Sequence, residues 1–171
     1  MPTEPAATEA PYGIGEITFT PGLAPAEMAD LLAFLPDQVA TIPRGGASSD
    51  SASATVVYVL QENPNAPNFG VVVALKVEPS DDAAAFITEL QRMRWGDPTD
   101  HNITATGDGA DGQPAFREFS RTFPATLFAL PNRPVYFLLW YRAGDDYAFM
   151  IVADSPATRE ALARAVAETL R

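Results

Sequence analysis

The sequence predicts an α+β domain, in which an antiparallel sheet of about five to six strands has helices packed mainly on one face. Two pairs of strand-like segments, the first rich in β-branched residues and the second in large apolar residues, are joined by turn-like residues, which is typical of hairpins. Amphipathic segments interrupt the strands singly, giving the order β-α-β-β-α-β-β-β-α. A parallel doubly wound sheet requires strict alternation of strands and helices, and the sequence lacks it.

The N-terminal part combines a non-periodic tail with the first two elements. Residues 1–13 are rich in Pro, Ala, Thr and Glu, and we expect a disordered tail or tether. A single domain is predicted over residues 14–171. It begins with a short strand, Gly15–Thr20, and a helix, Pro25–Leu35, in which apolar residues recur at helical spacing.

The middle of the chain predicts a loop, a hairpin and the clearest helix. Pro43–Ser53 is a Gly/Ser segment that we expect to be a mobile loop. Ala54–Gln61 and Phe69–Glu78 are rich in β-branched residues and predict paired strands. The helix Ser80–Trp95 has Ser80 as its expected N-cap and arginines in its last turn.

The C-terminal part predicts three strands and a helix. Pro114–Phe123 is the first strand, and Pro134–Arg142 with Asp146–Ala153 form a hairpin around a short turn. In the final helix, Ser155–Arg171, a serine is the expected cap and is followed by a proline suited to the first helical position.

Composition limits the classes of function. The formal net charge is −11, which disfavours nucleic-acid backbones and anionic membranes. The chain has no run of about 18 apolar residues, so no membrane span is predicted. It has no cysteine and a single histidine, His101, which makes thiolate chemistry and a histidine-based metal site hard to build. We expect no cofactor.

The glycine-rich string Gly107–Gly112 is the most site-like stretch of the sequence. Asp108 and Asp111 are candidate ligands for a divalent cation, but their spacing fits a calcium loop poorly. A mobile connection that enters the following strand is the favoured interpretation. His101, just after a helix, is expected to be a surface loop residue, with a general base oriented by Asp97 or Asp100 as the alternative.

The strand Pro114–Phe123 breaks the usual polar–apolar alternation. Arg117, Phe119 and Arg121 share one face, because side chains alternate with a period of two. This Arg–Phe face is a candidate binding site for an anionic or aromatic ligand. The alternative is an edge strand whose arginines lie over apolar surface and pair with carboxylates.

The strand Val135–Tyr141 is apolar on both faces, so each face must be covered. Tyr136 and Trp140 are on the face opposite to Phe137, and both are candidate ligand contacts. The chain itself is the favoured cover, and a second copy in a homodimer, another protein or a small-molecule ligand are the alternatives.

These patterns favour a non-enzymatic binding or interaction domain, with no catalytic residues assigned. The tail suggests the soluble part of a bacterial exported lipoprotein, hence an extracytoplasmic location in the cell envelope, and a cytoplasmic protein is the alternative. The competing functional hypothesis is a small hydrolase-like enzyme that uses Asp/His chemistry with a divalent metal, in which Asp97, Asp100, His101, Asp108 and Asp111 would converge.

Overall fold

The computed structural model describes residues 35–39, 41–49, 53–60, 68–96, 101–122 and 133–169. The predicted tail, the strand Gly15–Thr20 and the helix Pro25–Leu35, apart from Leu35, lie outside these residues. The described strands are β1 (Gln38–Val39), β2 (Ile42–Ser49), β3 (Ser53–Leu60), β4 (Asn68–Lys76), β5 (Asn102–Asp108), β6 (Ala115–Thr122), β7 (Pro134–Tyr141) and β8 (Tyr147–Ala153). The helices are α2 (Ala83–Trp95), the 3-10 turn η3 (Ala110–Gly112) and α3 (Pro156–Thr169).

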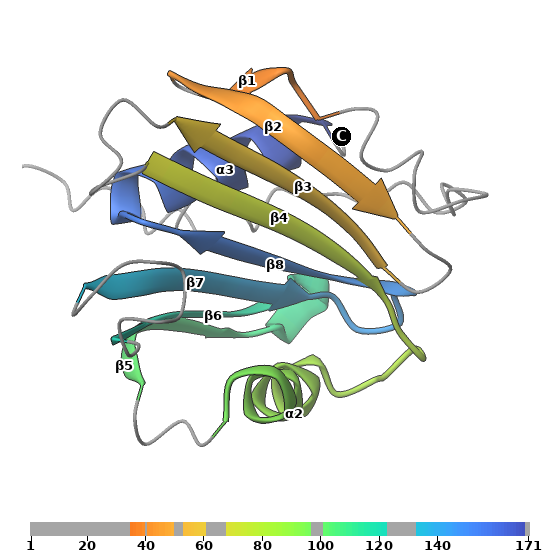
Figure 1. Ribbon diagram of the computed structural model, residues 1–171. Coiled ribbons are helices and arrows are strands. Elements are labelled where there is room, and N and C mark those ends of the chain that lie inside the picture. The colour runs from red at the N-terminus through yellow and green to blue at the C-terminus, as the bar shows by residue number, and fades with distance from the viewer. Residues whose placement is uncertain are drawn as a thin grey trace, which may run out of the picture.

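The eight described strands form one antiparallel sheet in the order β1-β2-β3-β4-β8-β7-β6-β5 (Figure 1). The predicted hairpins are confirmed, since β3 pairs with β4 and β7 pairs with β8. Strand β8 returns to the centre and pairs with β4, with Gly70 opposite Ala153 and Lys76 opposite Tyr147. This pairing joins two strand groups that are distant in the sequence.

The predicted α+β domain with a sheet of about five to six strands is wrong, because the described residues form mostly antiparallel sheet, with eight strands and two α-helices. Three of these strands, β1, β2 and β5, were not predicted. β2 covers Ile42 and the first seven residues of the predicted Pro43–Ser53 loop, and it pairs along β3 with one register shift between Arg44 and Gly46. β5 occupies the stretch expected to connect a helix to the next strand, and it pairs with β6. Proline and glycine in β2, and Asn102, Gly107 and Asp108 in β5, are residue types depleted in strands, and here backbone pairing to a neighbouring strand overrides that preference.

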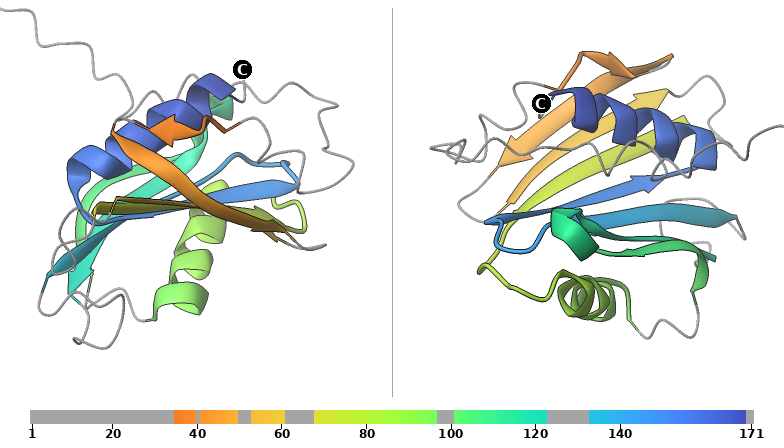
Figure 2. Two further views of the ribbon diagram at one scale, coloured as in Figure 1. Left: turned by 45° about the horizontal axis from the view of Figure 1, so that its top comes forward. Right: turned by 180° about the vertical axis from the view of Figure 1, so that it is seen from behind.

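The prediction of helices mainly on one face is also wrong. α2 packs on β5, β6 and β7, whereas α3 packs on β4, β7 and β8 from the opposite side (Figures 1 and 2). The sheet is therefore the middle of three layers. The strand β7 needs cover on both sides because it is apolar on both, and each helix covers one side of it.

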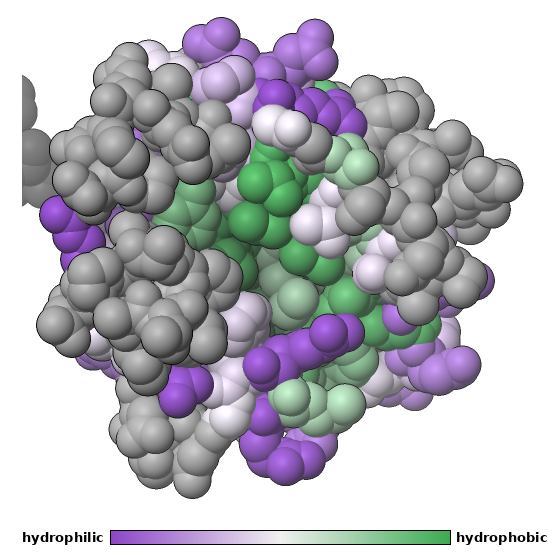
Figure 3. Space-filling view, in the orientation of Figure 1, coloured by the Kyte–Doolittle hydropathy of each residue, from purple (hydrophilic) through white to green (hydrophobic). Residues whose placement is uncertain are grey.

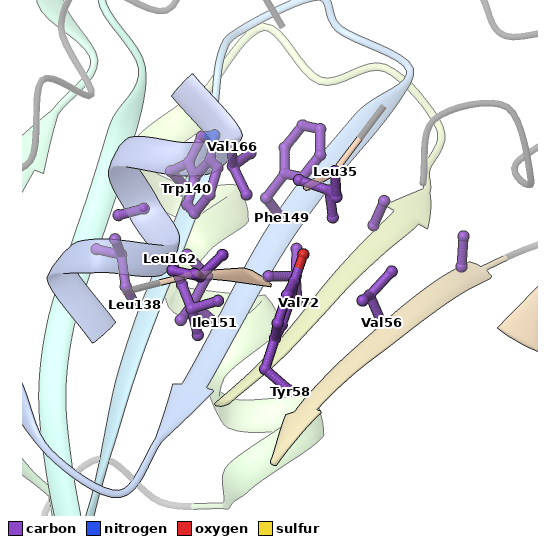
Figure 4. Close-up of a cluster of buried hydrophobic side chains, with 14 of the residues drawn as sticks. Leu35, Val56, Tyr58, Val72, Leu138, Trp140, Phe149, Ile151, Leu162 and Val166 are labelled. Carbon is purple, nitrogen blue, oxygen red and sulfur yellow. The ribbon is translucent and has the colours of Figure 1, made fainter. Parts of the chain in front are cut away.

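The core consists of two apolar clusters separated by the sheet. The cluster beneath α3 includes Trp140, Phe149 and Ile151 of the sheet with Leu162 and Val166 of the helix (Figure 4). The cluster beneath α2 contains the following buried residues: Ala83, Ile87, Leu90, Phe119, Phe137, Leu139, Tyr141, Met150 and Val152, among others. Alternation along β7 and β8 sends successive side chains into one cluster and then the other.

Candidate functional site: the face of the sheet beside α2

The start of α2 is fixed by a carboxylate cap. Asp82, rather than the predicted Ser80, is the N-cap, and its side chain accepts a hydrogen bond of 3.0 Å from the backbone N–H of Ala85. Ser80 instead binds the sheet, because its backbone N–H donates to Oη of Tyr141 at 2.8 Å. Phe86 lies against the Tyr141 ring, with ring centroids 4.1 Å apart. These contacts fix the helix over β7.

A chain of polar side chains links the last turns of α2 to β6. Nη1 of Arg117 donates to Oε1 of Gln91 at 2.7 Å, and Gln91 Nε2 lies 2.6 Å from His101 Nδ1. Arginine has no acceptor, so the Gln91 oxygen must face Arg117 and its amide N–H must face His101. His101 Nδ1 is then an acceptor, and Nε2 donates to the backbone oxygen of Trp95 at 3.1 Å. The network therefore holds a neutral His101 with its proton on Nε2.

His101 is buried, which corrects the expectation of a surface loop residue. His101 is only 8% exposed, and its ring stacks on the ring of Phe119 with the two centroids 4.7 Å apart. Phe119 in turn stacks on Phe137. The histidine is hydrogen-bonded to α2 at each ring nitrogen, through Gln91 and Trp95, and its ring packs on the sheet at Phe119. Joining α2 to the sheet is the role that this geometry supports.

The predicted Arg–Phe face lies under α2. Phe119 is fully buried, and Arg121 donates to the Trp95 carbonyl at 2.6 Å. Arg117 has Gln91 and Thr88 as neutral acceptors, and burial lowers its pKa from the ordinary value. The two arginines are therefore hydrogen-bonded to α2, and Phe119 packs beneath it. Ligand binding by these three residues stays a prediction.

The sheet separates the five predicted ligand contacts into two groups. Tyr136 and Trp140 lie on the α3 face, opposite to Arg117, Phe119 and Arg121. Trp140 is fully buried and stacks on Phe149 with centroids 5.0 Å apart (Figure 4). Tyr136 is half-buried, with the Arg159 guanidinium carbon 5.7 Å from its ring centroid. One ligand cannot contact all five residues, because a buried sheet lies between them.

The α3 face carries a buried ion pair. Nη2 of Arg159 lies 2.7 Å from Oε1 of Glu118, and the two side chains are only 4% and 10% exposed. Thr104 of β5 donates to the same carboxylate oxygen at 2.7 Å. Three elements, α3, β6 and β5, thus meet at one carboxylate. Because Glu118 binds both Arg159 of α3 and Thr104 of β5, the ion pair fixes the position of α3 on the sheet.

The two aspartates predicted as cation ligands belong to a turn. Asp108 Oδ1 accepts a hydrogen bond from the backbone N–H of Ala110, and Asp111 has a left-handed backbone with φ of 57°. His101 precedes β5 and Asp108 ends it, so the length of the strand, roughly 20 Å, separates them. In the part of the chain that the structure describes, no group of three or more His, Cys, Asp or Glu residues is placed to hold a metal ion. Asp97 and Asp100 lie outside that part.

An apolar groove lies beside α2, where the helix does not cover the sheet. Its floor comprises Val57 of β3, Val71 and Val73 of β4, and Met150 and Val152 of β8, which the register places side by side on the α2 face. The three valines are half-buried, unlike the fully covered side chains beneath α3. Figure 3 shows apolar atoms at the floor of a hollow in this side of the molecule. We call these five residues the valine groove.

Two side chains of α2 point toward the valine groove. Phe86 is half-buried and packs against the cluster beneath the helix. Met93 is 68% exposed, the most exposed large apolar residue of the described chain, and lies two turns further along the same side of α2. The opposite side of the helix carries Thr88 and Gln91, which bind Arg117. The helix thus presents a polar side to β6 and an apolar side to the groove.

The valine groove was not predicted from the sequence, although a signal was present. Phe69–Glu78 is apolar on both faces, like the strand Val135–Tyr141, so it also needs cover on both sides. α3 covers one face of β4, whereas α2 packs on β5–β7 and does not extend over the other face of β4.

None of the described helices is long and apolar enough to cross a membrane. No family model, curated protein or solved structure matched this chain.

Proposed function

We propose that this chain is a non-enzymatic binding domain whose valine groove takes a small molecule with an extended apolar body. The observation that carries the proposal is the apolar floor formed by three adjacent strands beside α2, in which three valines are only half-buried. Soluble proteins rarely leave contiguous apolar surface uncovered without a use for it. A concave apolar site also suits a small ligand better than a flat protein partner.

The groove is chemically suited to an apolar body with little charge. The five residues of its floor, Val57, Val71, Val73, Met150 and Val152, carry no ionisable group. Affinity would therefore come from removing apolar area from water, at about 25 cal/mol per Å². The alternative, a metal-dependent hydrolase, requires His101 to converge with Asp108 and Asp111, and β5 holds these residues apart.

The location of the protein remains part of the proposal. A tether to an envelope membrane was predicted from residues 1–13, which lie outside the described residues. A domain held near a membrane would meet lipid-derived apolar molecules, which suits the groove. This link depends on composition alone and is separate from the argument for binding.

Titration with the neutral fluorescent probe N-phenyl-1-naphthylamine tests the proposal. We expect saturable fluorescence enhancement, and we expect Val73→Thr to weaken the affinity about fivefold, since an isosteric hydroxyl costs about 1 kcal/mol on the floor. Met93→Lys at the rim should also weaken it. Ile103→Lys adds the same charge at a site on β5, away from the groove, and should leave the affinity unchanged. Absence of saturable binding, or equal binding by every variant, would contradict the proposal.

A further inference from the structure

The turn between β5 and β6 contains two Asp–Gly sequences, Asp108–Gly109 and Asp111–Gly112. In such a sequence the backbone nitrogen of the glycine can reach the preceding carboxyl group and close a five-membered ring with it. Glycine permits this step better than other residues, because it has no Cβ to hinder the approach and its backbone rotates freely. Which of the two sequences reacts therefore depends on how firmly the fold holds each one.

Asp108–Gly109 is held firmly. Asp108 pairs with Ala115 at the end of β5, and its Oδ1 accepts a hydrogen bond of 3.0 Å from the backbone N–H of Ala110. Gly109 lies against β6 and α2, since a Cβ on it would be 3.1 Å from the backbone nitrogen of Ala115 and 3.2 Å from Cβ of Ala83. Ring closure here requires the carboxylate to leave its hydrogen bond and a packed piece of backbone to move.

Asp111–Gly112 is held much less firmly. Both residues are exposed, and a Cβ on Gly112 would meet no atom within 4 Å. Within the described part of the chain, no hydrogen bond or ion pair reaches the carboxylate of Asp111. Its backbone is left-handed, with φ of 57° and ψ of 34°, which is strained for a residue with a Cβ. The 3-10 turn Ala110–Gly112 restrains the pair, and the hydrogen bonds of such turns have poor geometry.

We propose that Asp111–Gly112 is a site of spontaneous aspartate isomerisation. The backbone nitrogen of Gly112 attacks Cγ of the protonated Asp111 carboxyl group, a C–N bond forms, and the carboxyl O–H group leaves as water with the amide proton. Water then opens the succinimide ring. Opening at Cγ restores aspartate, whereas opening at the α-carbonyl gives isoaspartate, in which the main chain runs through Cγ and the α-carboxylate is free. One water molecule leaves and one enters, so no oxidant or reductant is needed.

Isoaspartate would change the turn that joins β5 to β6. It adds one methylene group to the main chain, so the strained left-handed conformation of Asp111 is no longer imposed. The pairs nearest the turn are Asp108 with Ala115 and Gly107 with Phe116. We expect amide hydrogen exchange at these pairs to become faster as isoaspartate accumulates, because a longer turn closes the hairpin less tightly.

Incubation in ¹⁸O-labelled water tests the site, because each cycle of ring closure and opening puts one solvent oxygen into the reacting aspartate. The full chain would be kept for several weeks at physiological temperature in mildly acidic buffer, then digested in ordinary water and mapped by mass spectrometry. A synthetic peptide of residues 107–114, GDGADGQP, shows how the two sequences react without the fold. Both aspartates should take up similar label in the peptide. In the folded chain, Asp111 should carry about fivefold more label than Asp108, since breaking one hydrogen bond slows a step by about this factor.

Two variants of the full chain provide the matched controls. Asp111→Gly removes the reacting carboxyl group, and glycine adopts the left-handed backbone without strain, so this variant should lose the label of the wild type in this turn. Asp108→Ala should keep the label at Asp111. Equal label at the two aspartates of the folded chain, or no label at Asp111 when the peptide is labelled, would overturn the proposal. The result is independent of probe binding in the valine groove.

Discussion

The two faces of the sheet differ in how they are covered, although they are built from alternate residues of the same strands. Beneath α3 the strands β3, β4, β7 and β8 bury a continuous apolar cluster, and the charged groups there form a buried ion pair. Beneath α2 only β5–β7 are covered, and the adjoining polar side chains form a largely neutral network. We infer that the α3 face provides stability and that the α2 face leaves room for a ligand.

The ion pair on the α3 face gives the largest expected effect. Arg159→Met should destabilise the fold by about 3–5 kcal/mol, because it leaves the carboxylate of Glu118 buried without its cation. Denaturant unfolding measures this loss. If the face depends on packing rather than on the charges, then Arg159→Met/Glu118→Leu should recover most of the lost stability. If Arg159→Met were as stable as the wild type, the ion pair would not stabilise the α3 face.

Adjacent valines of β4 provide the most direct comparison of the faces. Val72 is 1% exposed beneath α3, whereas Val73 is half-buried in the valine groove. Val72→Ala should cost about 2–3 kcal/mol in unfolding free energy, and Val73→Ala about 1 kcal/mol or less. Chemical denaturation of the two variants measures both costs. Equal losses would mean that the groove is covered as fully as the α3 face.

The polar network under α2 should contribute less than the ion pair. Gln91→Leu removes the donor to His101 and the acceptor for Arg117, both in buried or half-buried places. We expect a loss of about 1–2 kcal/mol, smaller than for Arg159→Met because the groups left without partners include only one cation, which stays half-exposed. Thermal and denaturant unfolding report the change. A loss equal to that of Arg159→Met would mean that the two polar networks do not differ.

Alkaline pH should act on both faces through buried tyrosines. Burial raises the pKa of Tyr58, on the α3 face, and of Tyr141, on the α2 face, above the ordinary value. Such groups stabilise the fold fully below the unfolded pKa, about 10, and lose that contribution as pH rises above it. Tyr58→Phe should make stability less dependent on pH above about 10. An unchanged pH dependence would contradict this role of Tyr58. The variant also loses the 2.7 Å hydrogen bond from Tyr58 to the Pro36 carbonyl.

Sequence patterns predicted the elements that carry strong local signals. The first hairpin was predicted from β-branched runs and the second from apolar strands around a short turn. Ser155 was correctly expected to cap the last helix, where its Oγ accepts from the backbone N–H of Thr158. β2 was missed because the proline and glycines of PRGGASS disfavour strands, and β5 because its short run ITAT is followed by Gly107 and Asp108. Both strands pair with stronger neighbours, β3 and β6.

The layer arrangement and the site were not predictable, for a related reason. Periodicity shows that β4 and β7 are apolar on both faces, but it does not show which helix covers which face, or how far. The burial of His101 depends on a residue of α2, Gln91, and a stacked ring of β6, Phe119, which come together only in the fold. The valine groove depends on where α2 ends its coverage of the sheet.

Chemical-shift mapping of probe binding tests the central claim most directly. The full chain, labelled with ¹⁵N, would be titrated with N-phenyl-1-naphthylamine while backbone amide signals are followed. We predict that the largest shifts occur at Val57, Val71 and Val73, at Met150 and Val152, and along the Phe86–Met93 side of α2. Shifts concentrated beneath α3, around Trp140 and Leu162, or the absence of saturable shifts, would contradict the account.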